Sequence, residues 1–126
     1  MKTQGAHVST DPRAAIAAAD TALGIEFGST RIKAVLIGPD HEVLATGGHG
    51  WENHLEGGLW SYTLDEVVAG LQSAYASLVA DVRERYDVTP TSYGSIGISA
   101  MMHGYLAFDA DDKLLAPFRT WRNTNT

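Results

Sequence analysis

The sequence contains no cysteine. This absence excludes disulfide bonds, zinc–thiolate sites and a thiol nucleophile, and it fits a reducing compartment such as the cytoplasm. The chain also lacks a cluster of lysine and arginine, since 9 basic residues stand against 15 acidic ones and the net charge is −6. Nucleic acid is therefore not an expected partner, because it would require a basic surface.

Long apolar runs are missing as well. No stretch approaches the roughly 20 apolar residues that cross a bilayer, so we expect no membrane partner. The alanine-rich segment between Asp11 and Asp20 is short and has a charge at each end, which makes it a poor secretory signal. These absences favour a cytoplasmic globular protein. We expect residues 1–21 to be a flexible or weakly helical extension outside the core, and residues 22–126 to form the domain.

The pattern after Leu23 predicts three short strands that form an antiparallel meander. Turn signals at Gly28 and at Gly38-Pro39 separate them. The strands are expected at residues 23–27, 31–37 and 42–46. Glycines close the third strand, and we expect the polar, aromatic and glycine-rich segment 49–62 to be a loop that packs on a surface or lines a cleft.

A long helix is predicted next, because Thr63 and Glu66 form a capping box and apolar residues then recur at spacings of three and four. The helix should end near Asp87, ahead of Pro90. The apolar strand expected at residues 93–99 can lie parallel to the first strand after a right-handed crossover. The fold class is therefore α/β, with a mixed sheet and the order β-β-β-α-β, followed by a hairpin.

The first chemical motif is the turn between the first two strands. Gly28 permits a positive φ, so that successive backbone N–H groups can converge on an anion. Ser29 and Thr30 add hydroxyl donors, and Lys33 adds a positive charge. The Glu26 carboxylate can hold a magnesium ion through water. A strand follows this turn, which excludes a Walker loop and a dinucleotide fingerprint. The alternative is a plain hairpin with a polar turn.

Two further groups are typical of a sugar site. Met102 and His103 follow the apolar strand, and ligands bind at the carboxyl ends of parallel strands in open α/β sheets. His103 offers a donor or acceptor to a sugar hydroxyl, and Met102 offers an apolar wall. Near the end of the sequence, Trp121 can pack on a sugar ring and Asn123 can bond hydroxyls. The alternatives are methionines that fill the core, a turn histidine and an amphipathic surface turn.

These motifs in this order resemble the amino-terminal part of the FGGY carbohydrate kinases, a branch of the actin/hexokinase/Hsp70 ATPase superfamily. Residues 24–33, Gly-Ile-Glu-Phe-Gly-Ser-Thr-Arg-Ile-Lys, look like that family's Gly-Ile-Asp-x-Gly-Thr-x-x-x-Lys. Residues 96–104 look like its Ile-Gly-x-Ser-Gly-Gln-Met-His-Gly, which is most typical of xylulokinases. Asp109 and residues 117–123 match the Asp and the Pro-x-x-x-Trp-x-Asp that follow.

The resemblance implies a ribonuclease-H-like, actin-like ATPase half-domain that uses ATP and Mg²⁺. The implied activity is phosphorylation of a hydroxyl on a small sugar, with a ketopentose such as D-xylulose as the first candidate. By position, the phosphate side would comprise Gly28, Ser29, Thr30 and Lys33, the metal side Glu26, and the sugar side Met102, His103, Trp121 and Asn123.

Three residues depart from the family pattern: Glu26 replaces Asp, Met101 replaces Gln, and Asn123 replaces Asp. The departures at Met101 and Asn123 leave the sugar open. L-ribulose, another sugar or polyol, or a sugar-sensing module without catalysis are the alternatives. Family members are several times longer, and the general base is expected beyond Thr126. We therefore expect an amino-terminal part of a longer protein that lacks kinase activity alone, with a homodimer of the full-length protein left open.

Overall fold

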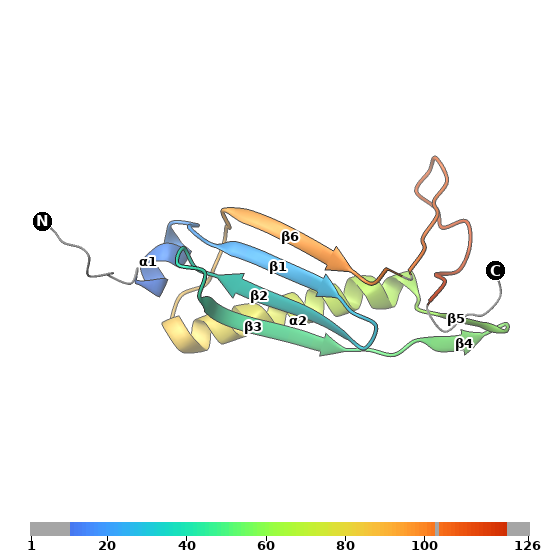
Figure 1. Cartoon of the computed structure of the whole chain (residues 1–126), viewed down its shortest axis with the longest axis horizontal. Helices are drawn as coiled ribbons and strands as arrows, with labels where there is room; N and C mark the ends of the chain where they lie inside the picture. The colour runs from blue at the N-terminus through green and yellow to red at the C-terminus, as the bar shows by residue number, and fades with distance from the viewer. Residues whose placement is uncertain (1–10, 103, 121–126) are drawn as a thin grey trace, which may run out of the picture.

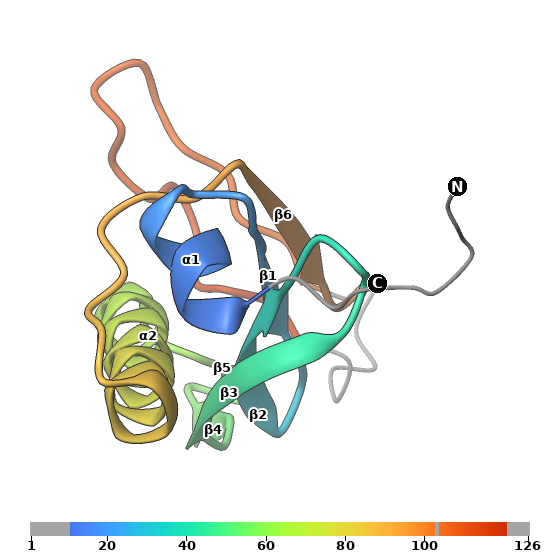
Figure 2. The ribbon, with the colours of Figure 1, turned by 90° about the vertical axis from the view of Figure 1, so that its left-hand side faces the viewer.

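The computed structural model describes residues 11–102 and 104–120, which form a mixed sheet with helices on one face (Figure 1, Figure 2). The elements are α1 (Pro12–Ala17), β1 (Ala22–Phe27), β2 (Arg31–Ile37), β3 (Val43–Gly50), β4 (His54–Glu56), β5 (Leu59–Ser61), α2 (Leu64–Tyr86) and β6 (Ser95–Ala100). Within these residues, no helix is long and apolar enough to cross a membrane.

The main sheet has the strand order β3-β2-β1-β6. Strand β1 runs antiparallel to β2 and parallel to β6, and β2 runs antiparallel to β3. The α/β class with a mixed sheet is thus confirmed. The chain crosses from the β3 edge of the sheet to the β6 edge through α2, which is why the neighbouring strands β1 and β6 can be parallel.

Helix α2 begins and ends where its local sequence predicts. The Glu66 amide donates to the Thr63 hydroxyl at 3.1 Å, and the Thr63 amide donates to Glu66 Oε1 at 2.9 Å. This capping box satisfies amides that the first helical turn leaves unpaired. At the other end, Asp87 adopts a left-handed conformation with φ 53° and its amide donates to the Arg83 carbonyl. The buried face of the helix is made by Gly70, Ala74, Leu78 and Val82.

The core has two parts, both on the face of the sheet that α2 covers. The first cluster comprises Ile16, Leu23, Ala34, Leu36, Leu44, Ala45, Leu78 and Val82. The second, which we term the aromatic cluster, comprises Ile32, Trp51, Tyr62, Ala74 and Phe118. The aromatic cluster lies under the end of the sheet where β1 and β6 finish, and this end carries the candidate site.

The amino-terminal segment differs from the prediction of an extension outside the core. Residues 12–17 form α1, which Asp11 caps by accepting from the Arg13 amide at 3.2 Å. Ala15 and Ile16 are buried, and Ile16 belongs to the first core cluster. A helix this short is unstable alone, so its order depends on packing that the local sequence does not show. Residues 1–10 lie outside the described part.

The region between β3 and α2 also differs from the prediction. Strand β3 does not stop at its glycines but continues through Gly47 and Gly48 to Gly50. The expected loop over residues 49–62 contains the β4–β5 hairpin, whose turn uses Gly57 and Gly58 at φ 56° and 80°. The hairpin expected after the last strand is reduced to isolated bridges, Tyr105 with Arg119 and Phe108 with Leu114.

Candidate functional site

The candidate site lies where β1 and β6 end side by side (Figure 1). The last paired residues are Phe27 and Ala100, and the Met101 amide extends the ladder by donating to the Phe27 carbonyl at 3.0 Å. The turn at residues 28–30 and the segment 101–102 therefore leave the sheet at the same end. This adjacency is what the carboxyl ends of two parallel strands provide.

A glycine is needed at position 28 because of close packing rather than a positive φ. Among the described glycines, only Gly57 and Gly58 have positive φ. The Gly28 amide donates to the Arg31 carbonyl at 2.9 Å, and a Cβ at Gly28 would also lie 2.9 Å from that oxygen. The predicted turn is present, but the predicted conformational reason for its glycine was wrong.

Two aromatic residues support this turn from below. The Trp51 indole Nε1–H donates to the Gly28 carbonyl at 2.8 Å, and the Tyr62 hydroxyl donates to the Ser29 carbonyl. The two rings stack with centroids 4.0 Å apart, and Phe118 meets Tyr62 edge-on. Sequence reasoning placed both residues in a loop and did not connect them with the turn. The available signal was the unusual aromatic content of segment 49–62.

Glu26 and Lys33 face each other across β1 and β2. They are register partners, and Lys33 Nζ lies 3.8 Å from Glu26 Oε1. Both side chains are more than half exposed, at 55% and 61%. An exposed pair of this kind contributes little to stability. Ser99 of β6 is the neighbour of Glu26 on its other side.

A groove of about 920 Å³ runs over the face of the sheet that α2 leaves uncovered. Gly24, Gly48 and Gly97 form much of its floor, and Glu26 and Lys33 line it. The Arg31 guanidinium lies over Gly48, where a Cβ would stand 2.6 Å from Arg31 Nη2. Ser29 and Thr30 do not line this groove, whereas Arg31, which directly follows the turn, does.

Of the predicted sugar-side residues, the structure places Met102. It is 87% exposed at the end of β6, whereas Met101 packs against the aromatic cluster. Gly104 approaches Phe118 so closely that a Cβ there would meet the ring at 3.0 Å. The aromatic cluster thus contacts both the turn and the chain after β6. His103, Trp121 and Asn123 lie outside the described residues.

A magnesium site was predicted at Glu26. Among residues 11–102 and 104–120, no three His, Cys, Asp or Glu side chains gather closely enough to hold a metal ion. Mg²⁺ in phosphate-binding sites keeps several waters and uses one or two carboxylates together with the phosphates. The exposed Glu26 carboxylate fits that limited role, and the metal ligand set remains a prediction.

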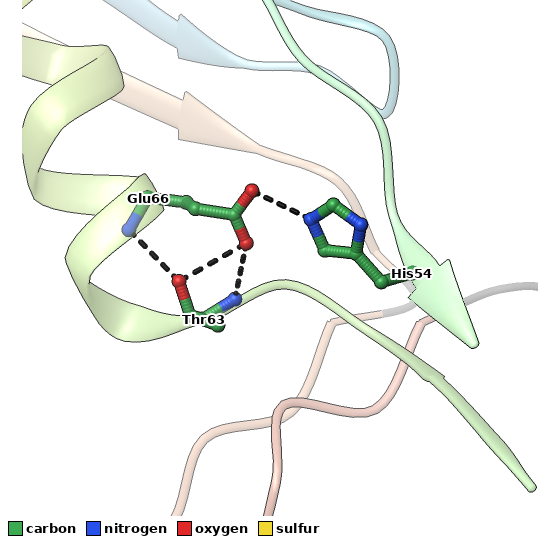
Figure 3. A network of polar contacts seen from close by, with 3 residues as sticks. All are labelled: His54, Thr63 and Glu66. Atoms are coloured by element: carbon green, nitrogen blue, oxygen red, sulfur yellow. Dashed lines mark hydrogen bonds and ion pairs between the residues drawn. The ribbon is translucent and has the colours of Figure 1, made fainter. Parts of the chain in front are cut away.

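A polar network fastens the β4–β5 hairpin to the start of α2 (Figure 3). His54 Nε2 lies 2.7 Å from Glu66 Oε2, while Glu66 Oε1 accepts from the amide and hydroxyl of Thr63. The hydrogen bond with Glu66, followed by its negative charge, raises the pKa of His54. Desolvation opposes ionisation of Glu66, but the hydrogen bonds from His54 and Thr63 outweigh it, so the pKa of Glu66 is lowered. Tyr62 directly precedes this network in the chain.

The mixed sheet, with its helices on one face and a turn between its first two strands, has the fold of the actin-like ATPases that it matches. The chain belongs to the FGGY family of carbohydrate kinases, because the model of that family's N-terminal domain matches residues 21–126. No curated protein sequence matches the chain.

Solved structures show the same fold. A xylulose kinase from Brucella ovis matches with a TM-score of 0.68 and 22% identity, covering 80% of this chain and 21% of its own. A xylulose kinase from Lactobacillus acidophilus matches at 0.61 and 22% identity, over 80% and 19% of the two chains. A glycerol kinase from Plasmodium falciparum matches at 0.63 and 17% identity, over 80% and 20%. The chain therefore spans about a fifth of the length of these structures.

Proposed function

We propose that this chain supplies the phosphate turn and part of the sugar site of a kinase that transfers a phosphoryl group from ATP to a small sugar. The supporting observation is that the turn at residues 28–30 and the segment 101–102 leave the sheet at one end. Phosphoryl transfer depends mainly on positioning and on stabilising charge. A phosphate turn beside a sugar-contacting segment provides positioning for both reactants.

The phosphate side would use the backbone amides of the turn, the hydroxyls of Ser29 and Thr30, and the ammonium of Lys33. Glu26 would hold Mg²⁺ through water, and the metal, when bound, would neutralise charge on the phosphates. Lys33 can exchange its exposed contact with Glu26 for a phosphate at small cost, because such a contact stabilises weakly in water.

The sugar side would use Met102 and His103, with Trp121 and Asn123 nearby. A ketopentose such as D-xylulose is the first candidate, since two of the structural matches are xylulose kinases. Met101 and Asn123 depart from the family pattern, so L-ribulose and other sugars or polyols belong in any substrate screen. No candidate for the base that removes the hydroxyl proton was found in this sequence, and we place that base in the remainder of a longer protein.

A sugar-sensing module without catalysis is the second candidate. It is favoured by the departures at Met101 and Asn123, which change the sugar side and leave the residues of the phosphate turn unchanged. The two candidates differ in one observable: a kinase consumes ATP in a sugar-dependent way, whereas a sensor binds sugar without turnover.

The test is a panel of ketoses and polyols offered with ATP and Mg²⁺ to the full-length protein. We expect sugar-dependent ADP release with one substrate group, most strongly a ketopentose. Uniform inactivity across the panel together with measurable sugar binding would establish the sensor and reject the kinase. Turnover by the 126-residue chain itself would contradict the placement of the base outside it.

A further inference from the structure

Three consecutive carbonyl groups of the turn accept hydrogen bonds from Trp51 and Tyr62. The Gly28 carbonyl accepts from Trp51 Nε1–H at 2.8 Å, and the Ser29 carbonyl accepts from the Tyr62 hydroxyl. The Thr30 carbonyl accepts from the Trp51 backbone amide at 3.2 Å. The donors come from only two residues, and both belong to the aromatic cluster beneath the turn.

The direction of these carbonyls fixes the direction of the amides that follow them. A trans peptide is planar, with its C=O and N–H groups pointing to opposite sides, and the described residues contain no cis peptide. The N–H groups of Ser29 and Thr30 therefore point away from the Trp51 indole and the Tyr62 hydroxyl. Neither the Ser29 nor the Thr30 amide donates a hydrogen bond to another described residue.

We propose that Trp51 and Tyr62 are positioning residues that aim the turn amides at a phosphate oxygen. The proposal rests on the proposed function of the turn as a phosphate site. Successive amides that point in one direction form a concave anion site. Donors that are already oriented bind a charge without the cost of reorganising the chain.

Trp51 and Tyr62 are themselves buried and anchored, so they can restrict the conformation of the turn. Trp51 is 8% exposed and Tyr62 is 2% exposed, and their rings stack against each other. Trp51 follows β3 directly, and Tyr62 lies immediately before the capped start of α2. Each donor is therefore anchored by a regular element rather than by a loop. A buried donor that lost its carbonyl partner would carry a desolvation penalty, which keeps the contacts formed.

The test removes one donor at a time while keeping the ring. Trp51→Phe removes the indole N–H, and Tyr62→Phe removes only the hydroxyl. Tyr86→Phe is the matched control, because the Tyr86 hydroxyl also donates to a backbone carbonyl, that of Leu44, at 2.7 Å and away from the turn. The ¹⁵N-labelled 126-residue chain is examined by NMR, first alone and then with tripolyphosphate as the probe.

We expect Trp51→Phe and Tyr62→Phe to shift and broaden the Ser29 and Thr30 amide signals of the free chain, because the turn peptides can then reorient. Each variant should weaken tripolyphosphate binding by about fivefold, the equivalent of one ordinary hydrogen bond. Tyr86→Phe should leave both readouts at their wild-type values. In the full-length protein, Trp51→Phe and Tyr62→Phe should raise KM for ATP and leave KM for the sugar unchanged.

The readouts separate two kinds of failure. Unchanged Ser29 and Thr30 signals in both folded variants would overturn the positioning role, whatever happens to phosphate binding. Altered signals together with no tripolyphosphate binding by the wild-type chain would overturn the phosphate assignment of the turn. If Tyr86→Phe had as large an effect as Tyr62→Phe, both substitutions would act by general destabilisation of the chain. That outcome would also overturn the positioning role. If a variant does not fold, the other variant and the free-chain signals still decide.

Discussion

Gly47 of β3 lies directly against the backbone of α2 at Leu78. A Cβ on Gly47 would stand 2.3 Å from the Leu78 nitrogen and 2.4 Å from the Ala74 carbonyl oxygen. Leu78 is fully buried, and Gly47 is what allows the helix to approach the strand so closely. This contact sets the distance between α2 and the sheet, and with it the depth of the core beneath the candidate site.

The first prediction concerns this contact. Gly47→Ala should destabilise the chain by about 2 kcal/mol or more, because the added methyl meets backbone atoms that cannot rotate away. Gly50→Ala is the control, since it lies on the same strand and a Cβ there meets nothing within 4 Å. The measurement is urea unfolding followed by circular dichroism. Similar midpoints for the two variants would contradict the prediction.

The second prediction concerns Lys33. Lys33→Ala should weaken tripolyphosphate binding by about tenfold and reduce its dependence on salt, because one positive charge at the turn is lost. Lys113→Ala removes an exposed charge from the loop that follows Asp109, outside the proposed phosphate site, and should leave binding unchanged. Isothermal titration at two salt concentrations gives both quantities. Equal affinities for the two variants would remove Lys33 from the phosphate site.

The third prediction concerns pH. The folded-state pKa of His54 is raised, so its contribution to stability is fully present below the unfolded value of 6.5 and is lost as pH rises through the folded pKa. The folded-state pKa of Glu66 is lowered, so its contribution is present above the unfolded value of 4.5 and is lost as pH falls through the folded pKa. The contact should therefore stabilise most in mildly acidic solution, between these two values.

His54→Asn should accordingly lower the melting temperature more at pH 5.5 than at pH 8. His41→Asn is the control, because His41 is exposed in the turn before β3 and its φ of 65° suits asparagine. Differential scanning calorimetry at both pH values supplies the comparison. A deficit that is the same at both pH values would show that protonation of His54 does not strengthen the contact.

Local sequence patterns were sufficient to predict several features of this chain. The capping box at Thr63 and Glu66 located the start of α2, and the apolar spacing carried the helix to Asp87. Both depend on residues within a few positions of each other, which is the range over which a helix forms its hydrogen bonds. The turn motif at Gly28 and the apolar strand before Met101 likewise identified the fold class and the family resemblance.

Only the tertiary structure decided which distant residues support the site. Trp51 contacts Gly28 across 23 positions, and Tyr62 contacts Ser29 across 33. The glycines of β3 suggest the end of a strand by local rules, whereas in the structure Gly47 lies within β3 and allows α2 to pack closely against it. Likewise, Ile16 is part of the core only because α1 packs against the residues of the sheet that belong to the first core cluster. The sequence by itself determined the turn, the helix and the family; long-range packing determined which way the turn points, because carbonyl orientation depends on donors brought from elsewhere in the chain.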